Sequence, residues 1–287
     1  MNGGRRRAIG LVLLAVVLAV GCTFAGRWQW GRHVTVDAEI AVVKANYSAP
    51  AVPIASVLPH LDTPLPDARV WTRVSLTGHY LTGATVLLRN RPVNSQSAFH
   101  VLVPFQLDPT DGAAGPVLVV DRGWIPQSST EESPSAAPTP PSGHVTITVH
   151  LRQQEPVSTR SAPPGQVQTI AVRQVLDAGG VAADVQAYDV FGGLDTETPA
   201  PATPLAALPA PSTDPGPHLS YAFQWWTFAL GALIGFGRMA LREARGEGPV
   251  PGARTAPAPR RVPASVARRG PSAEDEEDAL IDAQLGR

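Results

Sequence analysis

The chain has 287 residues, of which 44% are hydrophobic, and its formal net charge is −1 at pH 7. This charge balance excludes the global basic field typical of nucleic-acid-binding proteins. The single cysteine, Cys22, excludes an intramolecular disulfide, a CxxC redox pair and a cysteine-based zinc or copper site. Only two methionines are present, which excludes a methionine-rich copper site.

An uncharged apolar run from Ala8 to Gly26 follows the basic segment Arg5–Arg7. A helix of this length spans about 28 Å, enough to cross the hydrocarbon core of a bilayer. The run is long for the apolar region of a cleaved signal peptide. Ala19 stands three residues before Cys22, where a lipoprotein signal usually has Leu, Val or Ile. We interpret the run as a retained anchor, with lipid attachment at the cysteine as the alternative.

The segment between the two apolar runs has the pattern of a β-rich (α+β) domain. Apolar and polar residues alternate from Val70 to Thr77, the period of two that predicts a half-buried strand. Later stretches rich in β-branched or aromatic residues predict further strands at Thr85–Arg91, Phe99–Leu107, Val117–Arg122 and Val145–Leu151. The turn-forming sequence Asp108–Gly115 lies between two of these stretches and predicts a hairpin.

Three segments are poor in large apolar side chains and predict loops or linkers. Gln127–Gly143 is a low-complexity Pro/Ser stretch that we expect to be flexible. Residues 198–217 form a Pro-rich spacer, which we expect to be extended and semi-rigid. Residues 246–287 cannot bury a core, and their composition predicts a disordered tail.

A second uncharged apolar run, from Leu219 to Gly237, is followed by Arg238, Arg242 and Arg245. Positively charged residues next to membrane spans favour the cytoplasmic side. Because Arg5–Arg7 precede the first run, both arginine clusters are expected in the cytoplasm. The sequence therefore predicts a transmembrane hairpin with both termini inside and the domain outside.

Aromatic residues cluster at the expected outer ends of both runs. They are Trp28 and Trp30 after the first run, and Tyr221, Trp225 and Trp226 at the start of the second. Apolar rings with one polar atom favour the headgroup level, so these positions support the hairpin. Small residues that allow close helix packing occur within both runs, at Ala15, Ala19, Gly231 and Gly235.

These patterns predict a membrane protein in which a two-helix transmembrane hairpin flanks a β-rich extracytoplasmic domain. The expected segments are a cytoplasmic N-terminus (1–7), a first transmembrane helix (8–26), the domain (27–197), the spacer (198–217), a second transmembrane helix (219–241) and a disordered cytoplasmic tail (242–287). We expect a multi-pass protein of the plasma membrane, with the lipid bilayer as a partner and no nucleic-acid partner. The sequence leaves the oligomeric state open.

The motifs of common catalytic chemistries are absent from the sequence. GxSxG, HExxH and GxxxxGK[ST] do not occur, and no two of the seven histidines are four residues apart. We therefore expect no catalytic residues and no enzymatic activity. An extracytoplasmic enzyme of unknown type is the alternative.

His218 stands one residue before the second apolar run. It recurs with Tyr221 and Trp225 at helical spacing, so the three side chains are expected on one face of a helix at the membrane interface. A neutral imidazole in that position is able to ligate a haem iron. The alternative is an interfacial histidine at a helix start, and the residues alone favour this alternative.

Five stretches occur in a characteristic order, bracketed by the two apolar runs. They are Gly26–Arg32, Thr77–Leu81 with Leu87–Pro92, Phe99–Pro104, Val119–Pro126 and His218–Trp226. In this combination the chain resembles the surfeit locus protein 1 family, membrane proteins that assist assembly of haem-copper cytochrome c oxidase. The Pro/Ser insertion before Val145 and the long charged tail depart from the family pattern, and neither falls on a motif.

The resemblance implies an assembly factor that binds or inserts haem a while the catalytic subunit of the oxidase matures. In bacterial members the histidine at the start of the second helix is linked to haem a, and that position matches His218, beside Tyr221 and Trp225. Arg27 and Arg32 are candidates to pair with the haem propionates. Alternatively, these arginines anchor the helix at the membrane interface.

Composition agrees with haem as the cargo. Copper carriers present cysteine, methionine or clustered histidine, and this chain has almost none of them in the expected outer segment. A scaffold that binds an oxidase subunit without holding haem is the alternative function.

Overall fold

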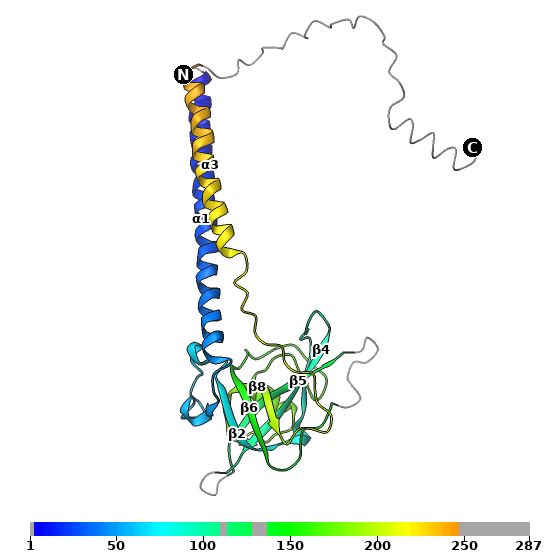
Figure 1. Ribbon diagram of the computed structural model, residues 1–287. Helices are drawn as coiled ribbons and strands as arrows, with labels where there is room; N and C mark the ends of the chain where they lie inside the picture. Colours follow the sequence, from blue (N-terminus) through cyan, green and yellow to red (C-terminus); the bar gives the residue numbers. More distant parts are fainter. Residues whose placement is uncertain (1–2, 110–113, 128–136, 247–287) are drawn as a thin grey trace, which may run out of the picture. The chain divides into compact units, whose positions relative to one another are not determined.

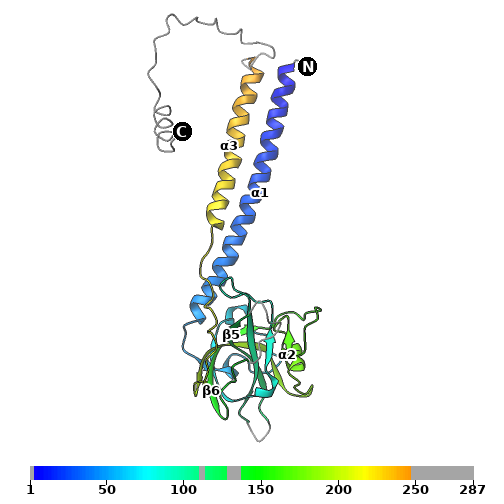
Figure 2. The same ribbon diagram turned by 90° about the vertical axis from the view of Figure 1, so that its right-hand side faces the viewer.

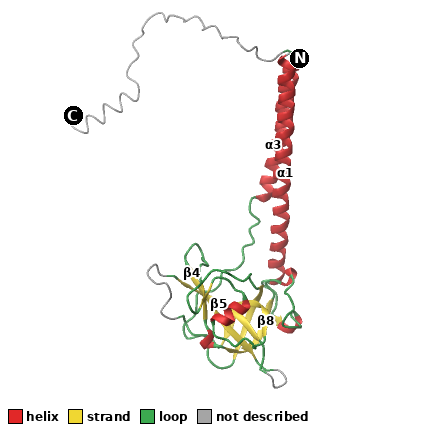
Figure 3. Cartoon of the chain, turned by 180° about the vertical axis from the view of Figure 1, so that it is seen from behind, coloured by secondary structure: helices red, strands yellow, loops and turns green. Residues whose placement is uncertain are grey.

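The computed structural model describes residues 3–109, 114–127 and 137–246. The chain divides into two compact units, one formed by residues 1–16 and 233–287 and a larger one formed by residues 17–232. The larger unit contains the strands, drawn in yellow in Figure 3. Almost all of the expected disordered tail, and residues 128–136 of the expected flexible stretch, lie outside the described residues.

The first apolar run lies in helix α1, which extends from Gly3 to Asn46. The helix continues past Gly26 because the next twenty residues contain no proline and only one glycine, Gly31. Residues 27–46 are therefore helical, although the sequence was interpreted as placing them in the β-rich domain. Within the described residues, α1 is the one helix that is long and apolar enough to cross a membrane, judged by length and composition.

The second apolar run lies in helix α3, His218–Ala244. Polar Gln224 and Thr227, together with Tyr221, lower the mean hydropathy of its first half relative to α1. A membrane span in α3 consequently stays a prediction.

Eight strands form one sheet in the order β1-β2-β6-β8-β5-β4-β3-β7. Their bounds are β1 Val52–Pro53, β2 Arg73–Tyr80, β3 Val86–Leu88, β4 Ala98–Leu107, β5 Val117–Pro126, β6 Val145–Gln153, β7 Gln166–Val167 and β8 Ala187–Thr198. Because β2 pairs with β4 as well as with β6, the strands β2, β6, β8, β5 and β4 close into a barrel (Figure 1). The closure requires Gly78, since a Cβ at this position would overlap the Gln106 carbonyl.

The predicted strands are present, and the predicted hairpin is confirmed. β4 and β5 are antiparallel and flank Asp108–Gly115, of which residues 110–113 lie outside the described part. In β2 the buried side chains alternate with outward-facing ones, as the period of two predicts. Strand β8 and the short helix α2, Val172–Ala178, had no counterpart in the sequence interpretation.

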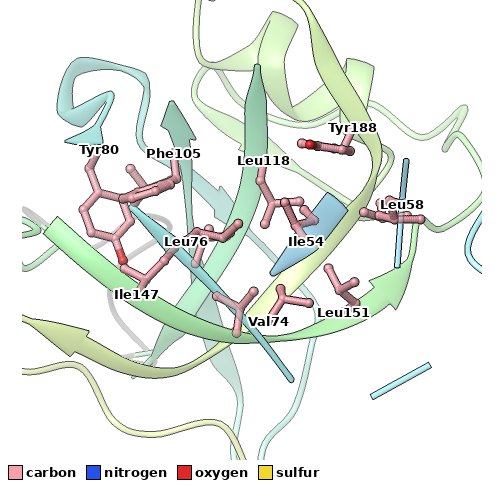
Figure 4. Close-up of a cluster of buried hydrophobic side chains, with 14 of the residues drawn as sticks. Ile54, Leu58, Val74, Leu76, Tyr80, Phe105, Leu118, Ile147, Leu151 and Tyr188 are labelled. Atoms are coloured by element: carbon pink, nitrogen blue, oxygen red, sulfur yellow. The ribbon is translucent and has the colours of Figure 1, made fainter. Parts of the chain in front are cut away.

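Two apolar clusters stabilise the β domain. The first fills the barrel interior with side chains from all five barrel strands, including Leu76, Phe105, Leu118, Ile147 and Tyr188 (Figure 4). The second lies between the outer face of the sheet and α2, which packs beside β5 (Figure 2). Strands β4 and β5 are therefore covered on both faces, as their continuous runs of buried residues require.

A buried ion pair crosses the barrel. The side chains of Arg122 and Glu197 are only 1% and 8% exposed, and two guanidinium nitrogens donate to the carboxylate at 2.6 and 3.2 Å. The Tyr80 hydroxyl donates to the same carboxylate at 2.9 Å, and burial raises the pKa of Tyr80. Arg122 also donates to the Pro138 carbonyl at 3.4 Å, and Ala137 packs against the core, so the end of the expected flexible stretch is docked on the barrel.

Residues 199–217, here called the strap, connect β8 to α3 without a helix or a named strand. Trp124 and Ala206 exchange two backbone hydrogen bonds, of 3.0 and 3.1 Å, and the Trp124 indole donates to the Ala207 carbonyl at 3.0 Å. Gly123 permits this contact, because a Cβ there would lie 2.5 Å from the Ala206 oxygen. The strap is thus held against the end of β5 eleven residues before α3 begins.

Candidate functional site

Within the larger unit, α1 and α3 pack closely through a glycine and two tryptophans. A Cβ at Gly26 would overlap the indole of Trp226, so the glycine lets that ring lie against the α1 backbone. The rings of Trp30 and Trp226 are 6.0 Å apart, and Trp30 also makes an edge contact of 5.8 Å with His33. These residues form an aromatic layer between the two helices.

The expected small-residue packing is only half correct. Ala15 and Ala19 are buried, as a packed face of α1 requires. Gly231 and Gly235 are exposed and have open space where a Cβ would stand. In the larger unit, the buried small residues of α3 are instead Ala222 and Ala229. They are seven residues apart, about two helical turns, and therefore both lie on the face of α3 toward α1.

A tight turn sets the start of α3. Gly216 has φ +66°, which glycine adopts without strain, and its amide donates to the Asp214 carboxylate at 2.8 Å. The Pro217 carbonyl accepts hydrogen bonds from the Tyr221 amide at 3.0 Å and the Ser220 hydroxyl at 2.8 Å. His218 is therefore fixed at the first residue of the helix.

His218 makes one side-chain hydrogen bond, and it crosses to the other helix. Its Nδ1 lies 3.0 Å from Oε1 of Gln29. An amide oxygen can only accept, so Nδ1 must carry the proton, and the neutral imidazole then has its lone pair on Nε2. In the described part of the chain, no group forms a hydrogen bond with this Nε2.

Tyr221 and Trp225 lie on the flank of α3 next to the face that packs on α1. Both are exposed, at 45% and 37%, and Trp225 makes an edge contact of 6.0 Å with the ring of Phe228. They share with His218 the broad face of α3 that the spacing predicts. They form an aromatic surface beside the imidazole.

The two arginines differ in their relation to His218. Both Arg27 and Arg32 are exposed on α1. At about 100° per residue, Arg32 lies roughly 60° around the helix from Gln29, whereas Arg27 lies roughly 160° away, on the opposite face. Helical geometry therefore brings Arg32 near the imidazole side and leaves Arg27 away from it.

His33 is the other histidine near this layer. Its Nε2 lies 3.5 Å from the carboxylate of Asp37, one turn later in α1. The described residues contain no group of three or more His, Cys, Asp or Glu side chains that could hold a metal ion. At this site the arrangement presents the single imidazole of His218.

Two further histidines have partners that the sequence did not reveal. His100 is buried, and its Nδ1 lies 2.8 Å from the Asp121 carboxylate. His150 stacks on Tyr47 with ring centroids 4.1 Å apart, and burial lowers the pKa of its imidazole.

Gln29 is the functional residue that the sequence interpretation missed. It was part of a family motif but received no role, because its partner is 189 residues away in the chain. A signal existed in the spacing: Gln29 and Trp30 stand three and four residues after Gly26, and four and three residues before His33, which places all of them on one helix face.

A family model described as the SURF1 family matches residues 16–230. Similar proteins include SURF1-like proteins of Mycobacterium bovis (strain ATCC BAA-935 / AF2122/97) and of Mycobacterium tuberculosis, strains CDC 1551 / Oshkosh and ATCC 25618 / H37Rv. Each is named as uncharacterised and is 36% identical over 241 residues, which cover 83% of this chain and 84% of the relative. The match includes the barrel, the strap and the aromatic layer.

Proposed function

The chain belongs to the SURF1 family, and on this premise we propose that it is an assembly factor for haem-copper cytochrome c oxidase that carries haem a to the maturing catalytic subunit. Family membership supports a role in oxidase assembly in general. The haem a step rests on the geometry around His218.

The observation that carries the proposal is the hydrogen bond between His218 and Gln29. Metal-ligating histidines almost always donate their other ring N–H to an oxygen, which fixes the tautomer and the ring orientation. Gln29 Oε1 has this relation to Nδ1 at 3.0 Å. Nε2 would then be the nitrogen that holds the haem iron, and attachment through one imidazole would allow the haem to be passed on.

His33 is the less suitable ligand of the two histidines near the layer. Its Nε2 faces the Asp37 carboxylate, so the nitrogen that points away from the α1 backbone is already engaged. His218 has no such competitor at Nε2 within the described residues.

The surroundings of His218 suit an apolar macrocycle with a long apolar tail. Tyr221, Trp225 and Phe228 present exposed rings along α3 after His218, where they can contact the porphyrin and its apolar tail. Arg32 is the arginine placed to pair with a propionate, through the charge-assisted hydrogen bonds that guanidinium groups form with carboxylates. Arg27, on the opposite face, then serves as an interface anchor.

The same proposal includes the membrane topology. Both α1 and α3 cross the bilayer, the β domain is extracytoplasmic, and both termini are cytoplasmic. Arginines at the start of α1 and the end of α3, and tryptophans at the opposite ends of the apolar runs, support this arrangement. A reporter active only in the cytoplasm, fused after Arg287, should be active; a stable but inactive fusion contradicts the hairpin.

The haem step is tested on the full-length protein purified in detergent from cells that make haem a. The wild type should show a haem a absorption spectrum. His218→Ala should lose this spectrum while the protein still inserts in the membrane, because the substitution leaves the apolar run intact.

His33→Ala is the matched control and should retain the spectrum. Loss of the spectrum in His33→Ala with retention in His218→Ala would move the ligand to α1 and overturn the assignment. A wild-type protein without haem, purified under the same conditions, would replace the haem carrier by a scaffold that binds an oxidase subunit.

A further inference from the structure

A groove of about 1010 Å³ lies in the larger unit. It is bordered by the C-terminal part of α1, the segment before β2, the end of β6 and the strap. Side chains that define it include Val34, Ile40, Val43, Val70, Trp71 and Arg152. The volume is that of a ligand pocket rather than of a packing defect, and we call it the α1 groove.

Arg152 is the cation of the α1 groove. Its guanidinium carbon lies 3.9 Å from the ring centroid of Trp71 and 5.9 Å from that of Phe191. In the described part of the chain, no acceptor forms a hydrogen bond or an ion pair with it. Burial lowers the pKa of Arg152, as expected for a cation that is partly removed from water.

Glu155 and Asp121, the carboxylates whose negative charge acts on Arg152, interact with other residues. Glu155 holds Arg91 through two hydrogen bonds of 2.6 and 2.7 Å. Asp121 holds the buried His100 at 2.8 Å. The donors of the Arg152 guanidinium therefore remain available to a ligand.

The backbone at Trp71 is strained to maintain the stack. Trp71 has φ +68°, a conformation that bulky side chains rarely adopt and that costs about 1–3 kcal/mol. Its amide donates to the Leu151 carbonyl at 2.9 Å, and the Asn46 side chain at the end of α1 donates to the Val70 carbonyl at 2.8 Å. These bonds hold the indole over Arg152, and an indole stacked on a guanidinium leaves the edge donors free.

We propose that the α1 groove binds the carboxylate of a long-chain carboxylic acid, with the carboxylate on Arg152 and the chain along the apolar wall. A planar carboxylate matches the fork of guanidinium donors, and its attraction is strongest where water is partly excluded. Because Arg152 is the cation of the α1 groove, we expect the ligand to carry one negative charge. Ile40, Val43 and Val70 provide the wall for the chain.

Acidic residues of the groove argue against a more highly charged ligand. Asp67 accepts a hydrogen bond from Gln153 at 2.8 Å, and Asp214 accepts one from the Gly216 amide. Together with exposed Glu39, these groups disfavour a phosphate dianion more strongly than a single carboxylate, because the repulsion grows with the charge of the ligand. The site is independent of the proposed haem step.

The test uses the full-length protein in detergent and a dibromostearic acid, whose bromine atoms quench nearby tryptophan fluorescence. The acid should quench part of the emission at a concentration at which its uncharged methyl ester does not. Arg152→Gln should weaken binding of the acid by about tenfold or more, since a charge-assisted hydrogen bond is lost. Arg160→Gln, at an exposed arginine, is the matched control and should bind as the wild type does.

Trp71→Phe identifies the reporter and should remove the saturable part of the quenching. Equal quenching by acid and ester in the wild type overturns the proposal without any variant. An unchanged affinity in folded Arg152→Gln does the same. Quenching that vanishes when anionic phospholipid is added, but not when the same amount of zwitterionic phospholipid is added, would replace the fatty acid by a lipid phosphate and also overturn the assignment.

Discussion

Substitution of Gly123 by alanine should release the strap from the barrel. Gly123 has φ +138°, and an added Cβ would lie 2.5 Å from the Ala206 oxygen and 2.9 Å from the Leu205 Cβ. Keeping the strap in place would combine backbone strain of about 1–3 kcal/mol with overpacking of about 1–3 kcal/mol.

Detachment of the strap from the end of β5 costs less free energy than keeping it in place against the added Cβ. It gives up the three hydrogen bonds between Trp124 and residues Ala206 and Ala207, each with a net value of about 0.5–1.5 kcal/mol. A destabilisation of about 2 kcal/mol raises the detached population about 30-fold. Because the strap leads into α3, detachment also loosens the position of His218.

Limited proteolysis with elastase, which cleaves after small residues, measures the detached population when opening is faster than cleavage. Gly123→Ala should speed cleavage near Ala206 by about 30-fold relative to the wild type, the increase expected for a 2 kcal/mol loss. Gly143→Ala is the control, because Gly143 has φ +80° but open space around its Cβ position. Equal cleavage of the two variants would refute the clash as the cause.

Three further results are expected. Glu197→Gln should lower the free energy of unfolding by about 3–5 kcal/mol, because it leaves the buried Arg122 guanidinium without its counter-charge. Asp195→Asn removes the carboxylate of a partly exposed pair with Arg73 and should cost at most about 1 kcal/mol in the same denaturant titration. Similar losses in the two variants would contradict this contrast. Burial lowers the pKa of His150 below its usual 6.5, so near that pH the unfolded chain binds more protons than the folded one. The free energy of unfolding should therefore fall as the pH drops through about 6.5, and His150→Phe should lose this part of the pH dependence. An unchanged pH profile in the variant would contradict the argument. In a dialysis assay, Gln29→Leu should weaken haem retention by about tenfold, because the acceptor for the His218 N–H is lost. Gln29→Glu keeps an acceptor and should retain haem. Equal loss in both variants would argue against a role of Gln29 in positioning the His218 imidazole.

Local patterns in the sequence were sufficient for the strands whose alternation is strict. The alternation from Val70 to Thr77 predicted β2, and Asp108–Gly115 predicted the β4–β5 hairpin, because both depend on neighbouring residues. Barrel closure could not be predicted in this way. It depends on Gly78 lying against the Gln106 carbonyl, a contact between strands that the sequence does not relate.

The length of α1 shows a different limit. The apolar run indicated where the helix is most hydrophobic but not where it ends, because residues after Gly26 lose the apolar character while keeping good helix formers. The helix ends where Asn46 bonds to the Ala68 and Val70 carbonyls, which is a tertiary event.

The candidate site was predictable residue by residue but not as an arrangement. His218, Tyr221 and Trp225 were identified from helical spacing, and the structure places them on adjacent strips of α3. The partner of His218, Gln29, belongs to the other helix and became evident only from the packed pair. The ion pair of Arg122 and Glu197 was missed for the same reason, since 75 residues separate its partners.

Axial ligation by His218 is tested most directly by chemical rescue. His218→Gly, purified in detergent and supplied with haem a, should lack the wild-type spectrum and should regain it when imidazole is added, because free imidazole can occupy the space of the missing side chain and ligate the iron. For this comparison the wild-type spectrum is recorded at the same imidazole concentration, because an iron with one protein ligand can also bind free imidazole. A His218→Gly protein that shows the wild-type spectrum without imidazole would contradict ligation by His218.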